Sequence, residues 1–201
     1  MAKRVFFSFH YDDVKTFRAN VVRNHGLLKD TGTSGFFDAS IWEDAKLHGV
    51  SSVKNLINNN LQQTSVTCVL IGSRTWSRRW VRYEIMKSFD RQNALLGVHI
   101  NGVKDKNQQS FSNGLNPFEF LGLYIDLYGK ATYWERTFYH GASYYQGSYG
   151  TWTKYNDLQP TLNFDRKFWG KGYTLSDWVP CYDWIKNQGY ENFATWIEAA
   201  K

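Results

Sequence analysis

Hydrophobic and polar positions follow two different periods along the first hundred residues. Short apolar runs predict buried strands over residues 4–9, 35–38, 66–71 and 95–100. Between these runs, apolar positions recur at helical spacing and predict helices over about 12–28, 51–61 and 79–91. Strands that alternate with helices are typical of a parallel sheet with helices on both faces. The pattern therefore predicts an α/β fold with a flavodoxin-like parallel sheet.

The pattern changes after residue 101. Residues 104–116 are polar and predict a loop. Two apolar runs, 118–128 and 131–138, flank Gly129-Lys130 and predict a hairpin. Residues 139–155 are rich in Tyr, Gly and Ser, and their aromatic content favours ordered, irregular strands over a disordered linker.

Two further helices are predicted near the end of the chain, around residues 182–185 and over 192–200. We expect residues 106–201 to form an aromatic-rich C-terminal elaboration that packs onto the sheet of a core spanning residues 1–105. The whole chain, 1–201, is then a single domain.

Composition narrows the class of protein. Hydrophobic residues make up 42% of the 201 residues, aromatics 18%, and the net charge is +6, which favours anionic partners such as nucleotides. No run of five Lys or Arg indicates a nucleic-acid tail, and no apolar run of 18 residues indicates a membrane span. The first residues lead directly into a predicted strand, so we expect a cytoplasmic protein. Cys68 and Cys181 have no metal-ligand spacing, so no metal site is expected.

The run from Thr67 to Glu84 carries the clearest candidate chemistry. It predicts a buried strand, a polar loop, a helix capped at Ser77, and then Trp80 and Glu84 four residues apart on one helix face. Open α/β sheets bind ligands at the carboxyl ends of their strands. A carboxylate beside an aromatic ring suits a sugar that carries a flat, cationic base. The alternative is that Trp80 packs under the loop and Glu84 is a solvated surface acid.

These residues resemble a TIR domain. The segment Val5-Phe6-Phe7-Ser8-Phe9 resembles the first TIR box, and residues 77–84 resemble the Ser-x-x-Trp-x-x-x-Glu start of the helix of TIR enzymes. The whole chain is similar to the TIR-like ThsB proteins of the Thoeris anti-phage system. That likeness rests on five segments in order, KRVFFSFHY, FDAS-WEDA, SVTCVLIGS, RRWVRYEIMKS and YDW, which lie between residues 3 and 184.

The resemblance implies an enzyme that consumes NAD. It would cleave the bond between nicotinamide and ribose and make a cyclic ADP-ribose isomer that activates a partner effector, ThsA. Glu84 would be the catalytic carboxylate, and Phe6, Ser8 and Trp80 would contact the substrate. Two further candidates for substrate contact follow the second predicted strand, namely Asp38 and Trp42. Phe6 has a rival interpretation as a core residue, and Asp38 one as a turn residue.

The chemistry explains why one carboxylate suffices. Nicotinamide leaves NAD without needing a proton, so the acid of an ordinary glycosidase pair is dispensable. Glu84 would stabilise positive charge on the ribose and stay ionised, aided by Arg82 and Lys87 if they lie near it. No Gly-x-Gly-x-x-Gly follows the first strand, so NAD is expected as a substrate and not as a cofactor.

Two other functions remain open at the level of sequence. One is a non-catalytic TIR-type module that works by homotypic assembly, and a homo-oligomer is compatible with either role. The other is a nucleoside or nucleotide-sugar transferase that uses similar chemistry on another glycosidic bond. The presence of Glu84 with Trp80 favours an enzyme over the assembly module, because a scaffold does not need that pair.

Overall fold

The centre of the molecule is a parallel sheet. The computed structural model describes residues 3–25, 45, 47–140 and 147–201. Its first sheet has the strand order β1-β2-β3-β10, and the bounds are Val5–Ser8 for β1, Val66–Ile71 for β2, Ala94–His99 for β3 and Cys181–Asp183 for β10. Three of the predicted strands are thus confirmed as parallel neighbours. The remaining one, 35–38, lies outside the described residues.

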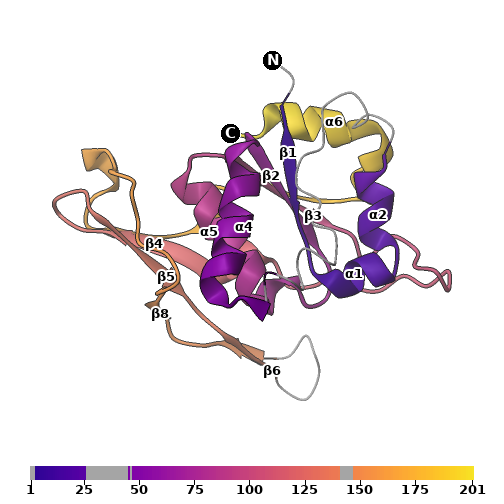
Figure 1. Ribbon diagram of the computed structural model, residues 1–201, viewed down its shortest axis with the longest axis horizontal. Coiled ribbons are helices and arrows are strands. Elements are labelled where there is room, and N and C mark those ends of the chain that lie inside the picture. Colours follow the sequence, from indigo (N-terminus) through magenta and orange to yellow (C-terminus); the bar gives the residue numbers. More distant parts are fainter. Residues whose placement is uncertain (1–2, 26–44, 46, 141–146) are drawn as a thin grey trace.

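Helices cover both faces of this sheet, as predicted (Figure 1). One face carries α1 (Tyr11–Lys15), α2 (Arg18–Arg23) and α6 (Gly189–Ala199), and the other carries α4 (Val50–Gln62) and α5 (Arg79–Asp90). None of the helices in the described ranges is long and apolar enough to cross a membrane.

Strand alternation assigns the side chains of β1 to the two faces. Phe7 packs with Phe193 of α6, at a ring-centroid distance of 6.2 Å, in the cluster that also holds α2. Phe6 points to the other face, where it is fully buried in a cluster with Ile57 of α4 and Tyr83 of α5. Successive side chains of a strand point to opposite faces. Phe6 and Ser8 therefore face α4 and α5 together.

The first predicted helix, 12–28, is two helices in the described part of its range. The helix is interrupted between α1 and α2 at Phe17, whose φ is +67°. The helical spacing of Phe17 predicts a core position, but its side chain is 54% exposed. No Gly or Pro lies at the break, so the sequence carries no signal for it.

The helix predicted around residues 182–185 is wrong. Cys181–Asp183 forms strand β10, which pairs in parallel with β3 and places Cys181 opposite Gly97. A Cβ at Gly97 would lie 2.6 Å from the Cys181 sulfur, so the glycine allows the close approach. Tyr182 then stacks on Trp196 of α6 at 4.3 Å. A short apolar segment cannot be assigned to strand or helix by periodicity alone.

A second, antiparallel sheet follows the first hundred residues. Its order is β8-β5-β4-β9, and its strands are β4 (Leu121–Ile125), β5 (Ala131–Glu135), β8 (Thr153–Lys154) and β9 (Lys171–Thr174). A two-stranded ribbon joins β6 (Phe138–His140) to β7 (Gly147–Tyr149). The hairpin of β4 and β5 and the loop over 104–116 are confirmed, whereas the sequence pattern does not predict the four-stranded sheet.

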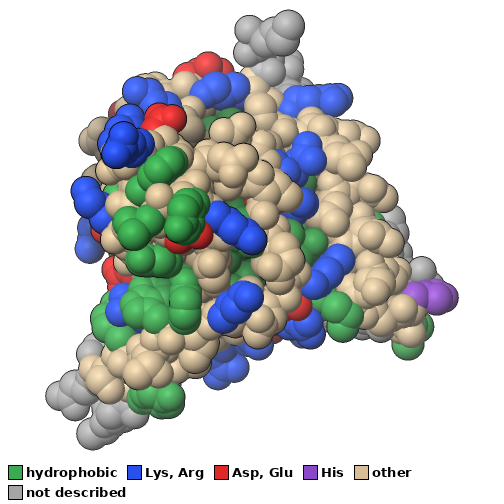
Figure 2. Space-filling model, turned by 90° about the vertical axis from the view of Figure 1, so that its left-hand side faces the viewer, with side chains coloured by type: hydrophobic (Ala, Val, Ile, Leu, Met, Phe, Trp, Pro, Cys, Tyr) green, Lys and Arg blue, Asp and Glu red, His purple; other side chains and the backbone are tan. Residues whose placement is uncertain are grey.

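Helix α5 lies between the two sheets (Figure 1). Its Val81 and Ile85 join a core with Ile71 of β2 and with Leu123 and Tyr133 of the second sheet. Figure 2 views the molecule from the side of the second sheet, where hydrophobic side chains gather among lysines and arginines. A cavity of about 420 Å³ in this sheet is lined by Gly122, Tyr124, Trp134, Trp152, Gly172 and Tyr173, among others.

The C-terminal part of the chain returns to the first sheet and contributes to its core. Strand β10 and helix α6 bury Trp184 and Phe193 in the core of that sheet. We expect that limited proteolysis will not release a stable fragment of residues 1–105, because the fragment would lose this apolar contact area. Mass spectrometry and circular dichroism of the digest provide the measurement. A folded, protease-resistant 1–105 fragment would contradict the prediction.

Candidate active site

Glu84 lies at the interface between helix α5 and strand β1. The hydroxyl of Ser8, the last residue of β1, donates a hydrogen bond to Oε2 of Glu84 at 2.5 Å. The contact joins residues 76 positions apart and is buried, since Ser8 is fully buried and Glu84 is 5% exposed. Two residues that the sequence names as separate site candidates are thus in direct contact in the structure. The alternative of Glu84 as a solvated surface acid does not fit this burial.

A second polar contact fixes α5 against the sheet one turn further on. The hydroxyl of Ser88 donates to the backbone carbonyl of Glu84 at 2.7 Å and lies 2.7 Å from the hydroxyl of Thr67 on β2. Both hydroxyls are buried, and these hydrogen bonds satisfy polar groups that have lost contact with water. The helix turn that carries Glu84 is therefore held to β1 and β2 by hydrogen bonds.

Burial controls the ionisation of Glu84. It raises the pKa of the carboxyl from the usual 4.5 to about 8, and the hydrogen bond from Ser8 opposes this shift only in part. Arg82 and Lys87 would favour the ionised form of Glu84 if they lay near it, and this condition is not met. The Arg82 guanidinium binds Glu135, at 2.6 Å, and the Lys87 ammonium lies 3.5 Å from Asp90. Both cations are on α5 but point away from Glu84.

Phe6 and Trp80 lie on the same side of the sheet as Glu84. Phe6 is fully buried, and Trp80 is half-buried against the hydrophobic cluster that contains Phe6. The Trp80 ring meets Tyr83 edge-on at 6.2 Å, and the Arg79 guanidinium lies 5.0 Å from its centroid. The core interpretation of Phe6 therefore fits its surroundings. A half-buried Trp80 keeps part of its surface available for stacking.

Other predicted residues are placed differently or lie outside the described residues. Asp38 and Trp42 fall in the range that the structure does not describe. The prediction that Ser77 caps α5 is wrong. Arg78 is the N-cap, without a side-chain cap, and the Ser77 hydroxyl donates to the carbonyl of Arg74 at 3.1 Å within a 3-10 turn. A serine close to a helix start is a common cap, but here the extra turn intervenes.

A second buried acid lies at the carboxyl end of β2. Asp13 is 7% exposed, and a Cβ at Gly72 would lie 2.2 Å from its Oδ1. Burial raises the pKa of Asp13 to about 6, although Arg18 lowers it in part. Within the described part of the chain, its Oδ2 has no hydrogen-bond partner. Sequence reasoning missed this acid because an aspartate just after a strand is typical of a helix cap.

Two arginines lie near His10 at the same edge of the sheet. His10 follows β1 by two residues, and its pKa is lowered by burial first and then by the charge of Arg78. Arg74 also lowers the pKa of His10 and is exposed. Positive charge beside the strand ends favours an anionic ligand there.

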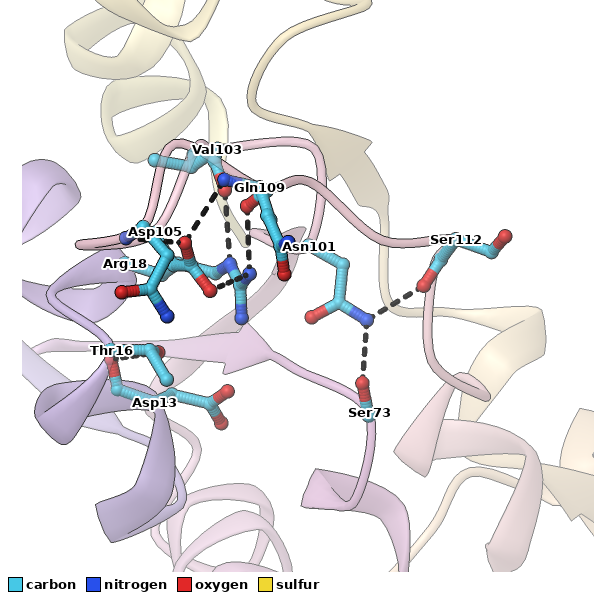
Figure 3. A network of polar contacts seen from close by, with 10 residues as sticks. Asp13, Thr16, Arg18, Ser73, Asn101, Val103, Asp105, Gln109 and Ser112 are labelled. Carbon is cyan, nitrogen blue, oxygen red and sulfur yellow. Dashed lines mark hydrogen bonds and ion pairs between the residues drawn. The ribbon is translucent and has the colours of Figure 1, made fainter.

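The loop after β3 is tied to both neighbouring elements at this edge (Figure 3). Arg18 of α2 forms a buried ion pair with Asp105 at 3.2 Å. The side-chain amide of Asn101 donates to the hydroxyl of Ser73 at 2.9 Å and to the carbonyl of Ser112 at 2.7 Å. The loop is thereby fixed beside the turn that leads into α5.

Comparison with known proteins finds a family and a relative that this chain resembles. The family described as Thoeris protein ThsB, TIR-like domain, matches residues 6–105, a range that includes Ser8 and Glu84. The chain is also similar to the putative cyclic ADP-D-ribose synthase ThsB1 of Bacillus cereus (strain MSX-D12). The two are 48% identical over 201 residues, and the match covers 98% of this chain and 100% of the relative.

Proposed function

Because the chain belongs to the ThsB family of TIR-like Thoeris proteins, we propose that it is an NAD-cleaving ADP-ribosyl cyclase. It releases nicotinamide and makes a cyclic ADP-ribose isomer that serves as a signal in anti-phage defence. The observation that carries the proposal is the buried contact between Ser8 and Glu84 at the carboxyl end of the sheet. The name of the full-length relative, a cyclic ADP-D-ribose synthase, supports the same reaction.

The reaction follows from the charge of the groups involved. The bond between nicotinamide and ribose C1′ breaks, and the electron pair leaves with nicotinamide, which becomes neutral. Positive charge develops on the ribose, and the Glu84 carboxylate stabilises it in a site with little water. A nucleophile of the same substrate molecule then attacks C1′ and loses its proton, which closes the ring. Attack by water instead gives ADP-ribose.

The remaining roles are assigned by position. Ser8 holds the Glu84 carboxylate through its hydrogen bond, and Trp80 stacks on the ribose or base. Phe6 supports this side of the pocket from its core position. Asp38 and Trp42 complete the substrate-binding set. The product activates the effector ThsA, and the protein acts in the cytoplasm. NAD is the substrate, and the reaction needs no cofactor.

Product identification tests the proposed function. Purified protein is incubated with NAD, and the products are separated and identified by mass spectrometry. We expect free nicotinamide and a product of the mass of cyclic ADP-ribose. No cleavage under conditions that trigger the protein would favour an assembly module. Cleavage of other nucleosides but not of NAD would favour a transferase.

Removal of the Ser8 hydroxyl is expected to raise the pKa of Glu84 and to lower the rate of NAD cleavage. The hydrogen bond from Ser8 lowers the pKa of Glu84, so the Ser8→Ala variant should have a pKa of Glu84 above 8. A hydrogen bond to a charged group contributes roughly 1.5–3 kcal/mol, so kcat/KM at pH 7.5 should fall by about tenfold or more. Steady-state kinetics from pH 6 to 9 provide the measurement. An unchanged rate together with an unchanged pH midpoint would argue against the contact.

A further inference from the structure

Helix α5 is held from two opposite sides at the turn that carries Glu84. Residues advance by about 100° around an α-helix, so Arg82 and Glu84, two positions apart, point roughly 200° away from each other. Glu84 contacts β1 of the first sheet, and Arg82 contacts the end of β5 in the second sheet. One helical turn is therefore fixed to both sheets.

The Arg82 guanidinium uses all three of its nitrogens. Nη1 donates to Oε2 of Glu135 at 2.6 Å, Nη2 to the carbonyl of Arg136 at 3.1 Å, and Nε to the carbonyl of Trp76 at 3.0 Å. The residue is 7% exposed, so the ion pair is partly shielded from solvent. These acceptors belong to the end of β5, the residue after it, and the 3-10 turn before α5. Only a planar, forked cation can reach all three at once.

The same helix is tied to the C-terminal elaboration at both of its ends. Near the beginning of α5, the Arg79 guanidinium binds Asp157 at 2.7 and 2.8 Å. At the other end, Asp90 accepts hydrogen bonds from the Tyr133 hydroxyl at 2.8 Å and from the backbone of Thr161 at 2.7 Å. The Arg82 contacts lie between these ties and closest to Glu84. The C-terminal elaboration thus holds α5 along the length of the helix.

We propose that Arg82 and Glu135 are positioning residues for the reaction, because they fix the rotation of α5 that presents Glu84 to Ser8. The inference rests on the proposed function for its catalytic consequence. A displacement of about 1 Å from the reactive geometry can cost on the order of a hundredfold in rate. A loosened α5 would also admit water to Glu84, and hydration would remove part of the burial that raises its pKa.

Two variants at the contact test the proposal, with one control. Arg82→Lys keeps the charge but cannot form the forked contact, and Glu135→Gln keeps the shape but removes the partner charge. Lys154→Gln removes a charge from β8, where the exposed Lys154 lies opposite Trp134 and makes no described contact with α5. The first readout is the pKa of Glu84, measured by ¹³C NMR of the side-chain carboxyl. The second is the pair of kcat and KM for release of nicotinamide from NAD.

We expect both contact variants to lower the plateau kcat, measured above the pKa of Glu84, about five- to tenfold with less than twofold change in KM, and to lower the pKa of Glu84. The Arg82→Lys/Glu135→Gln double variant should lose no more than the worse single variant, because the two residues act through one contact. The control should match the wild type in both readouts. A purely structural role would reduce the folded fraction and leave the kinetics and the Glu84 titration of the folded molecules unchanged.

The two readouts separate the two proposals. If the folded contact variants keep the wild-type pKa of Glu84 and the wild-type kcat, the positioning role is overturned. If the wild type cleaves no NAD but the contact variants lower the pKa of Glu84, the proposed reaction fails while the positioning of the carboxyl stands. If Arg82→Lys does not fold, Glu135→Gln tests the proposal alone by the same criteria.

Discussion

Replacement of Glu84 by glutamine is expected to abolish the release of nicotinamide from NAD without loss of the fold. The substitution keeps the shape of the side chain, and the amide oxygen can still accept the hydrogen bond from Ser8. What it removes is the negative charge that opposes the positive charge on the ribose. Loss of one preorganised contact of this kind typically costs on the order of 10²–10³ in rate. Here the carboxylate is the principal stabiliser, so the residual rate should fall below detection.

The same substitution should also stabilise the protein at alkaline pH. The pKa of Glu84 is about 8 in the folded state against a usual 4.5, so the folded protein holds a proton that the unfolded chain has released between these values. The free energy of unfolding therefore falls as the pH rises from about 4.5 to about 8, and it stays low above that. The uncharged glutamine avoids this loss, which is on the order of several kcal/mol. Denaturant unfolding at pH 5 and pH 9 provides the measurement.

Two controls make the result interpretable. The assay must use wild-type protein that is shown to form product, because a resting enzyme that is silent gives the same reading as an inactive variant. Circular dichroism must show that Glu84→Gln is folded. If the folded variant released nicotinamide at the wild-type rate, the proposed mechanism would be wrong. A loss of activity with a gain in stability at pH 9 is the combination that a buried catalytic carboxylate predicts.

Local patterns are sufficient for the part of the site that lies on a single element or at a strand end. The spacing of Trp80 and Glu84 places both on one face of α5, and strand alternation places Phe6 and Ser8 on one face of β1. Both predictions follow from fixed periods of the backbone. The resemblance to TIR domains joins the two segments into one site, and the family match confirms that resemblance.

Features that depend on distant segments cannot be read from the sequence. The local pattern of the segment that forms strand β10 predicts a helix. It forms a strand because it pairs with β3, more than eighty residues earlier in the chain. The ionisation of Glu84 is equally hidden, since Arg82 is two positions away in sequence but is engaged by Glu135, 53 residues later. Periodicity carries no information about such partners, and the burial that raises the pKa of Glu84 exists only in the packed structure.

The dependence of the rate on pH follows from that burial. If the ionised carboxylate is the active form, kcat/KM should rise about tenfold per pH unit up to the pKa of Glu84 near 8 and then level off. The rate at pH 6 should thus be roughly a hundredfold below the plateau. Other buried groups at this edge titrate lower, because the pKa of Asp13 is about 6 and that of His10 is lowered from 6.5. Between pH 7 and 9 the profile should therefore report Glu84.

The profile of kcat should have a lower midpoint than that of kcat/KM. In the complex with NAD, the cationic nicotinamide ring lies close to Glu84 and favours the ionised carboxylate, which lowers its pKa. The profile of kcat/KM reports the free enzyme, and that of kcat reports the complex with NAD. The difference between their midpoints therefore measures how far bound NAD lowers the pKa of Glu84. Initial rates of nicotinamide release at saturating and at low NAD, from pH 6 to 9, provide both curves. A kcat/KM that is independent of pH over this range would show that cleavage does not depend on the charge of Glu84, because no group with a pKa near 8 in the free enzyme could then be required in its ionised form.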